Sequence, residues 1–224
     1  MRSSGVFIMA RYYNIHTHHA TWEADCLSVQ NRSADFHLPL HGDYCSMGLH
    51  PWYLDNADKM YHWLQQQASQ PQVVAIGECG LDKVRGADWD MQVHWFRLQL
   101  QLANRLKKPL IIHCVRAFQE VLQILKEEQA AVPVIFHGFH KKRQLAEELL
   151  SHGYILSFGT ALLRNNEMLA GVFKQVPPEQ FFLETDDAPV SVKELYPIAA
   201  QIRKTEEDAI ILQLQKNFKN IFGV

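Results

Sequence analysis

Three histidines stand within four positions of the stretch RYYNIHTHHA, residues 11–20, directly after a run with the composition of a β-strand. Because successive side chains of an extended segment point to opposite faces, Asn14, His16 and His18 project to one side. Two imidazoles then converge, and neutral imidazole is a common ligand of divalent transition metals. An isolated pair of this kind is more often a solvated turn than a metal site. Further ligand-type residues elsewhere in the chain are needed to distinguish the two interpretations.

Further side chains of metal-ligand type follow the later apolar runs, one after nearly every run. They are His50, Glu78, His113, His137 and Asp186. A single His or Glu at a strand end is usually structural, but a series of them at equivalent ends is not explained residue by residue. Four histidines and two carboxylates suffice for a two-metal site in which one carboxylate bridges the ions and positions stay open for water. Such a site activates water, so hydrolysis is the natural reaction class.

These side chains need a scaffold that brings many strand ends together. Strand-like runs occupy residues 12–16, 43–50, 72–78, 109–114, 133–137, 153–159 and 180–184. Helical spacing of apolar residues occupies residues 91–108, 117–129, 142–152 and 167–175, and an amphipathic closing helix is expected at 206–222. Alternation of this kind with short connections predicts a parallel sheet. Seven or eight such units in one chain predict an α/β fold of the (β/α) TIM type, with chemistry at the carboxyl ends of the strands.

The span from residue 17 to residue 43 does not fit a regular barrel. Residues 26–31 read as a second strand, but too few residues separate them from the first strand for a helical crossover. We therefore expect a distorted or truncated barrel with an irregular, more open wall on that side.

Composition sets the remaining bounds. The chain has 224 residues, 47% of them hydrophobic, and a net charge of −2, which gives no general basic field for nucleic acid. We expect residues 1–224 to form one domain, with residues 1–9 as a disordered leader and Met9 as an alternative start. Four scattered cysteines and no membrane-length apolar segment predict a cytoplasmic protein with reduced thiols, no membrane association and no obligatory protein partner.

An ordered series of motifs runs from residue 12 to the C-terminus: NIHTHH, GLHPWY, IGECGLD, LIIHCVRA, FHGF, FLETDDAP and NFKNIFG. The series resembles the TatD family of metal-dependent deoxyribonucleases, within the amidohydrolase-like group, in a short variant. The resemblance implies two or more divalent ions held by His16, His18, Glu78, His113, His137 and Asp186. It also implies catalytic roles for Asp186, which would orient or deprotonate the attacking water, and for Glu78, which would bridge the ions.

The sequence departs from the family pattern at several positions that bear on the substrate. Asn14 stands where the family usually has Asp, Lys141 stands where Gly often follows the His-x-Phe motif, and Arg116 lies one residue later than the family's Arg. We expect His50, Arg116 and Lys83 to contact the substrate, His50 by resemblance and the two cations because basic residues cluster after the strands.

Three functions remain open at this stage. The first is hydrolysis of DNA phosphodiester bonds, and the second is hydrolysis of a small amide, lactone or phosphate ester on the same site. The third, metal-dependent binding without catalysis, is disfavoured because all six ligand types are present. The ions are two divalent cations drawn from Zn, Mn, Mg, Fe, Co or Ni, with Mg less suited to histidine-rich coordination.

Overall fold

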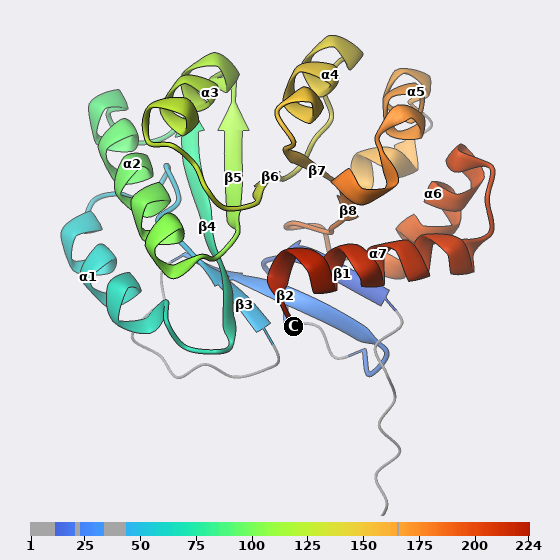
Figure 1. Ribbon diagram of the computed structural model, residues 1–224, viewed down its shortest axis with the longest axis horizontal. Helices are drawn as coiled ribbons and strands as arrows, with labels where there is room; N and C mark the ends of the chain where they lie inside the picture. Colours follow the sequence, from blue (N-terminus) through green and yellow to red (C-terminus); the bar gives the residue numbers. More distant parts are fainter. Residues whose placement is uncertain (1–11, 21–22, 34–43, 165) are drawn as a thin grey trace, which may run out of the picture.

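Eight parallel strands follow one another in chain order around one sheet in the computed structural model, which describes residues 12–20, 23–33, 44–164 and 166–224 (Figure 1). The strands are β1 (Tyr12–Thr17), β2 (Cys26–Arg32), β3 (Tyr44–Met47), β4 (Val73–Asp82), β5 (Leu110–Val115), β6 (Val134–Phe136), β7 (Ile155–Phe158) and β8 (Phe181–Leu183). Neighbouring strands pair in parallel throughout, which confirms the predicted barrel class.

The sheet closes beyond the end of its last strand. Thr17 of β1 forms an isolated parallel bridge with Asp186. The carbonyl of His16 accepts hydrogen bonds from the backbone N–H groups of Thr185 and Asp186, and the N–H of His18 donates to the carbonyl of Asp186. These bonds therefore hold His16, His18 and Asp186 together at one edge of the barrel.

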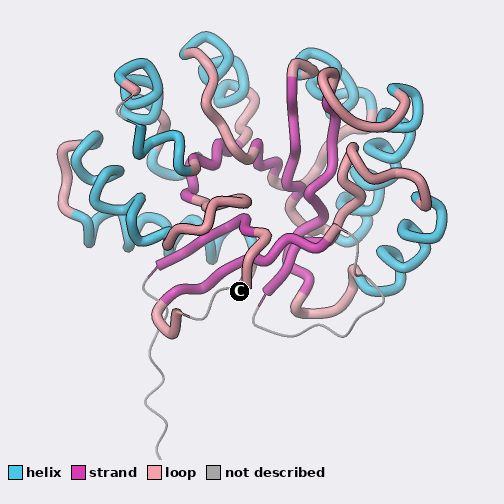
Figure 2. Tube along the Cα trace, turned by 180° about the vertical axis from the view of Figure 1, so that it is seen from behind, coloured by secondary structure: helices cyan, strands magenta, loops and turns pink. Residues whose placement is uncertain are grey.

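Helices pack around the outside of the sheet (Figures 1 and 2). They are α1 (Ala57–Gln67), α2 (Trp89–Leu106), α3 (Phe118–Glu127), α4 (Arg143–Ser151), α5 (Glu167–Gln175), α6 (Leu195–Arg203) and α7 (Glu207–Phe222). The short 3₁₀ turns are η1 (Thr160–Arg164), η2 (Pro178–Gln180) and η3 (Val192–Glu194). All five predicted helices are present, but α1 and α6 were not anticipated from the sequence. Helix α1 spaces Ala57, Met60, Tyr61 and Leu64 as an amphipathic helix does, a signal that the sequence prediction overlooked. Helix α6 carries Pro197 in its first turn, where proline is tolerated.

The wall formed by β1 to β3 has a different cover. No helix lies between β1 and β2 in the residues described there, 18–20 and 23–25. Helix α7 packs on this side instead, with the Phe218 ring 5.1 Å from that of Tyr13 and 6.3 Å from that of Tyr44. The irregular wall is confirmed over these residues, whereas residues 34–43 and the predicted leader, 1–9, lie outside the described residues.

Two predicted strands are wrong at their far ends. Strand β4 runs on to Asp82 rather than stopping at residue 78, because Gly80 allows β5 to approach closely: a Cβ at Gly80 would lie 2.1 Å from the carbonyl oxygen of His113. Strand β3 ends at Met47, before Gly48, rather than at residue 50. Glu78 therefore lies inside a strand instead of at its end, and His50 lies in a loop.

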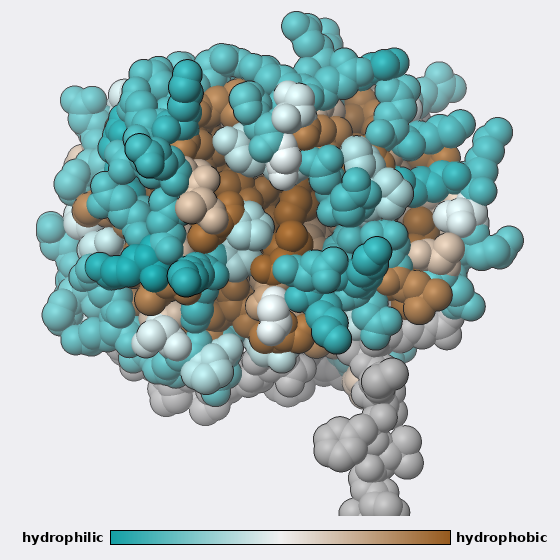
Figure 3. Space-filling view, viewed as in Figure 1, coloured by the Kyte–Doolittle hydropathy of each residue, from teal (hydrophilic) through white to brown (hydrophobic). Residues whose placement is uncertain are grey.

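Polar residues cover the helices and apolar residues fill the interior. Figure 3 shows hydrophilic side chains over the outward faces of the helices, with hydrophobic residues visible between them. The interior is filled by large apolar side chains, which include Phe96, Phe136, Phe158 and Phe182. Among the residues described, no helix combines the length and apolar character that a membrane crossing requires.

Candidate metal centre

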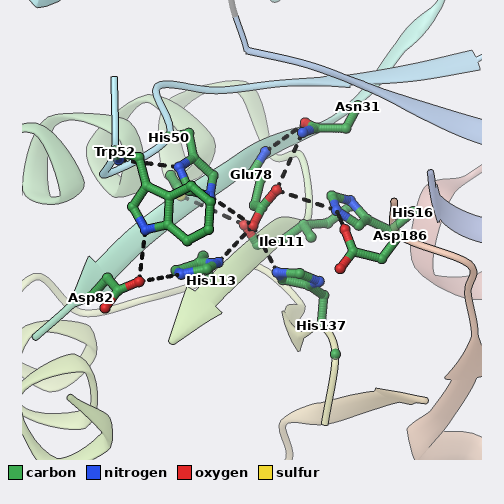
Figure 4. A network of polar contacts seen from close by, with 12 residues as sticks. His16, Asn31, His50, Trp52, Glu78, Asp82, Ile111, His113, His137 and Asp186 are labelled. Atoms are coloured by element: carbon green, nitrogen blue, oxygen red, sulfur yellow. Dashed lines mark hydrogen bonds and ion pairs between the residues drawn. The ribbon is translucent and has the colours of Figure 1, made fainter. Parts of the chain in front are cut away.

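Glu78, in the middle of β4, is the point on which the predicted site converges (Figure 4). Its side chain is only 2% exposed, and its two oxygens face different groups of histidines. Oε2 lies 3.3 Å from Nε2 of His16 and 3.5 Å from Nε2 of His18. Oε1 lies 2.8 Å from Nδ1 of His113 and 2.8 Å from Nε2 of His137.

Asp186 completes the group that faces Oε2. Its Oδ1 lies 3.5 Å from Nε2 of His16 and 3.4 Å from Nε2 of His18, and its side chain is 45% exposed. The backbone bonds that close the barrel place Asp186 beside β1. The structure thus brings all six predicted ligands together, and the role of each remains a prediction.

His16 supplies the test of whether these residues fit a metal ion. The residue is fully buried, yet neither Nδ1 nor Nε2 of its ring has a hydrogen-bond partner of good geometry. A buried polar atom without a partner costs free energy, and a cation at Nε2 would satisfy it. Three sets of donor atoms lie close enough together to share an ion: His16–His18–Glu78, His16–His137–Asp186 and His50–Glu78–His113. The residues therefore fit divalent cations.

The charges of the cluster point the same way. Burial alone would raise the pKa of Glu78, but the charge of His137 and hydrogen bonds from neighbouring imidazoles hold it well below its usual value. Hydrogen bonds to Asp186 and Glu78 raise the pKa of His18 to about 10. Burial opposes a charge on His137, yet Glu78 raises its pKa well above the usual value. Protons on the imidazoles thus occupy the place of a positive charge that the carboxylates require, and metal ions compete for the same lone pairs.

Two carboxylates that sequence reasoning missed hold the far sides of His113 and His137. Oδ2 of Asp82 lies 3.1 Å from Nε2 of His113, and Oε1 of Glu184 lies 3.2 Å from Nδ1 of His137. In each ring the other nitrogen lies 2.8 Å from Oε1 of Glu78, so both ring nitrogens face carboxylates, which only accept. A metal ion at the nitrogen that faces Glu78 would take the place of the proton there, and the far carboxylate would keep the proton on the far nitrogen. Asp82 could have been found by alternation, since residues 78, 80 and 82 share a face once β4 is extended.

His50 has the opposite proton arrangement. Its Nδ1 accepts a hydrogen bond of 3.1 Å from the backbone N–H of Trp52, so the proton of the neutral ring is on Nε2. That nitrogen lies 3.2 Å from Oε1 of Glu78 and donates to it. Burial lowers the pKa of His50, which favours the neutral ring. His50 is therefore arranged as a hydrogen-bond donor rather than as a ligand with a free lone pair.

Neutral side chains fix the two carboxylates and the loop that carries His50. The side-chain amide of Asn31, on β2, donates to Oε2 of Glu78 and its oxygen accepts from the Glu78 backbone N–H. Asn14 exchanges two hydrogen bonds with Thr185, next to Asp186. The amide of Gln99, on α2, brackets the backbone of Leu49 beside His50.

A pocket of about 340 Å³ opens beside the cluster, on the side of β5 to β8. His113, His137 and Asp186 line it together with Cys114, Phe139 and Lys141. Alternation along β5 predicts that Cys114, next to His113, points away from the site, but Cys114 lies partly buried in this pocket. The same burial raises the pKa of its thiol to about 12, so it stays protonated.

Comparison with known proteins gives the family. The sequence model of the family described as TatD related DNase matches residues 40–223. The chain belongs to this family. The predicted resemblance is thereby confirmed, and the protein is a TatD-family metal-dependent hydrolase.

Individual TatD-family relatives cover much of the chain. An uncharacterized metal-dependent hydrolase of Buchnera aphidicola is 29% identical over 195 residues, which are 80% of this chain and 74% of that protein. The 3′-5′ ssDNA/RNA exonuclease TatD of Erwinia tasmaniensis is 32% identical over 153 residues, which are 65% of this chain and 59% of that protein. The crystal structure of YJJV, a TatD homolog from Escherichia coli, superposes with a TM-score of 0.82 at 24% identity and covers 96% of this chain and 99% of its own. At that identity the superposition shows the fold alone.

The residues predicted to contact substrate lie in three different settings of this TatD-family fold. His50 is buried against Glu78, as described above. The ammonium of Lys83 forms an ion pair with Glu120 of α3 and lies 5.5 Å from the ring of Trp89. Arg116 is exposed in the loop after β5 and does not line the pocket. Contact of each with substrate remains a prediction.

Proposed function

We propose that this protein is a two-metal phosphodiesterase that hydrolyses DNA. The observation that carries the proposal is the arrangement of Glu78, whose two oxygens face two separate groups of metal-ligand side chains. A carboxylate placed in this way suits a bridge between two cations.

The two ions would be held by different residues. His16, His18 and Asp186 would bind one ion with Oε2 of Glu78, and His113 and His137 would bind the other with Oε1. When bound, the ions supply a nucleophilic water at neutral pH and neutralise charge on the phosphoryl oxygens. A donor set rich in imidazole favours Zn, Mn, Fe, Co or Ni over Mg.

The protein's own side chains would place the substrate and move the proton. Asp186, nearly half exposed toward the pocket, is positioned to orient the attacking water or take its proton. The Nε2–H of His50 would turn from Glu78 to a phosphoryl oxygen once the ions occupy the carboxylate. Phosphodiester bonds suit this combination because their charge is spread over several oxygens.

Features around the site support a nucleic-acid substrate. Trp52 and the exposed Tyr53 lie next to His50, with ring centroids 4.8 Å and 5.6 Å from its imidazole. The guanidinium of Arg85 lies 4.0 Å from the Trp52 ring. Aromatic and guanidinium faces of this kind stack on unpaired bases, which favours a single-stranded substrate. The relative from Erwinia tasmaniensis carries the name of a single-strand exonuclease.

A second candidate is hydrolysis of a small amide, lactone or phosphate ester on the same metals. The pocket favours it, because about 340 Å³ is near the lower end of the range for small-molecule sites. Its apolar walls would accept a compact substrate without any contact to Trp52 or Tyr53.

One panel of reactions separates the two candidates. The purified protein is stripped of metal, reloaded with each divalent cation in turn, and assayed on single-stranded DNA, bis-p-nitrophenyl phosphate, a lactone and a dihydropyrimidine. Metal-dependent cleavage of DNA and of bis-p-nitrophenyl phosphate is the expected result. Turnover of the lactone or the dihydropyrimidine with no cleavage of either phosphodiester would support the second candidate instead.

We also propose a cytoplasmic location. All four cysteines are free thiols, which suits a reducing compartment. Fractionation of cells that produce the full-length chain would test this, and recovery in a secreted or membrane fraction would contradict it.

A further inference from the structure

Lys141 differs from the other cations near the metal centre because it lines the pocket and has no acidic partner in the described part of the chain. Its ammonium donates to Nε2 of His140 at 2.8 Å, and its pKa is lowered by burial and by the nearby charge of Arg116. Lys83 pairs with Glu120 and Arg143 pairs with Glu147, whereas Arg116 and Lys142 do not line the pocket. Lys141 thus brings into the pocket a positive charge that no ion pair holds among the residues described.

A short hydrogen-bonded chain fixes the position of this ammonium. Nδ1 of His140 lies 2.7 Å from the carbonyl oxygen of Gly138, which only accepts, so the imidazole proton is on Nδ1. Nε2 of His140 is then free to accept from Lys141. The backbone N–H of Gly138 in turn donates to Glu184, which also contacts His137. The cation is therefore tied to the same backbone turn that positions a predicted metal ligand.

We propose that Lys141 binds a second phosphate group of the substrate, distinct from the phosphate that is hydrolysed. The inference rests on the proposed phosphodiesterase function and specifies the substrate further. The phosphate under attack would be held by the metal ions and His50, so it has no need of this cation. An ammonium with two N–H groups left to donate, on the wall of the same pocket, is suited to an additional phosphate on the departing or the retained nucleotide.

The chemistry admits two sources for this phosphate, and both occur in nucleic acids. It can lie on the 5′ side or on the 3′ side of the scissile bond. Asp186 and Asp187 also line the pocket, so an anion bound there away from the metals depends on Lys141 for its counter-charge.

The test compares substrates that differ by one phosphate. The metal-loaded protein is assayed on bis-p-nitrophenyl phosphate, on the dinucleotide TpT, and on TpT carrying a terminal phosphate at either its 5′ or its 3′ end. Lys141→Met should raise KM for one phosphorylated dinucleotide by about five- to tenfold, the scale of one charge-assisted hydrogen bond at a partly exposed site. The KM values for TpT and bis-p-nitrophenyl phosphate should change less than about twofold, because neither carries the second phosphate.

Two further variants control for charge and for folding. Lys142→Met removes the adjacent positive charge, which is exposed, outside the pocket and not hydrogen-bonded at the start of α4, and it should leave all four KM values unchanged. Lys141→Arg should keep most of the preference for the phosphorylated dinucleotide. The phosphorylated end that responds identifies the side on which the second phosphate lies.

An equal loss on all four substrates in Lys141→Met, or no change on any, would overturn the inference. If the wild-type protein cleaves no phosphodiester, the proposed function fails. The role of Lys141 is then tested by nucleotide binding instead of by kinetics. Calorimetric titration would compare thymidine 3′,5′-bisphosphate with thymidine 5′-monophosphate. Tighter binding of the bisphosphate that is lost in Lys141→Met upholds the second-phosphate site, whereas equal affinities in the wild type overturn it.

Discussion

The two sides of Glu78 are built by different means. On the Oε2 side, His16 and His18 belong to or follow β1, and backbone hydrogen bonds that close the barrel hold them against Asp186. On the Oε1 side, His113 and His137 are held by carboxylates behind them, Asp82 and Glu184.

This difference predicts that the two proposed metal positions have unequal properties. Negative charge on the Oε2 side comes from carboxylates that face the ion directly, Glu78 and Asp186. On the Oε1 side much of the negative charge comes from Asp82 and Glu184, which lie behind the imidazoles and do not face the ion. These carboxylates fix the imidazole tautomers and increase the basicity of the rings. Loss of a backbone-held ligand should therefore abolish a site, while loss of an outer carboxylate should weaken one.

Glu78→Gln should have the largest effect, because it removes the one charge that both sides share. We expect loss of both metal ions and a fall in kcat of more than about 10²-fold, with the fold retained. Metal content by mass spectrometry, activity and far-UV circular dichroism measure the three quantities. Retention of two ions per chain would show that the carboxylate is not the bridge.

Asp186→Asn should act on one side only. The Oε2 position loses a directly facing charge, so hydrolysis should fall by at least about 10²-fold while the ion on the Oε1 side is retained. One bound ion per chain, instead of two, is the expected metal content. Full activity in this variant would remove Asp186 from the mechanism.

Asp82→Asn should produce an intermediate effect on the other side. An amide can present its N–H₂ to Nε2 of His113, which would shift the ring proton to Nδ1 and block the lone pair that faces Glu78. We expect affinity for the Oε1-side ion to fall about 10- to 100-fold. Competition with a chelator measures this affinity in the absence of any substrate.

Trp52→Phe is the matched control for that variant. It removes the 2.7 Å hydrogen bond from Trp52 Nε1 to Asp82 and leaves a smaller ring beside His113. Because the carboxylate remains, the ion should be bound nearly as well. Equal losses in the two variants would mean that Asp82 acts through packing rather than through the proton on His113.

Arg116→Ala should have the smallest effect and should leave both sides of Glu78 intact. The side chain is exposed and outside the pocket, so a contribution of at most about threefold to KM for single-stranded DNA is expected, as for other screened surface charges. Steady-state kinetics at low and high salt would measure it. Loss of metal from this variant would show that the ligand set has been misjudged.

The sequence was sufficient for the fold class and for bringing the ligand types together, because both depend on local signals. Apolar runs mark the strands, and a His or an acidic residue follows most of them. What the sequence lacked was the length of individual strands. Strand β4 extends through Gly80 to Asp82 because β5 can approach a glycine there, and this depends on a contact between two chain segments.

The proton arrangement of the histidines was also beyond sequence analysis. His50, His113 and His137 all lie near the same oxygen of Glu78, and their residue type does not distinguish them. Only the partner of the other ring nitrogen does so: a backbone N–H for His50, and a carboxylate for each of the other two. Helix α1, by contrast, could have been found, since Ala57, Met60, Tyr61 and Leu64 recur at helical spacing among its polar residues.

The closure between β1 and the segment after β8 also determines when the site can exist during biosynthesis. Asn14 and Thr185, which hydrogen-bond to each other there, are 171 residues apart in the chain. Contacts of such long range form late in folding because the loop between them must first be ordered. A growing chain on the ribosome therefore carries its first histidines long before Asp186 can join them, and an ion held on the Oε2 side as proposed would be bound tightly only when the barrel is complete.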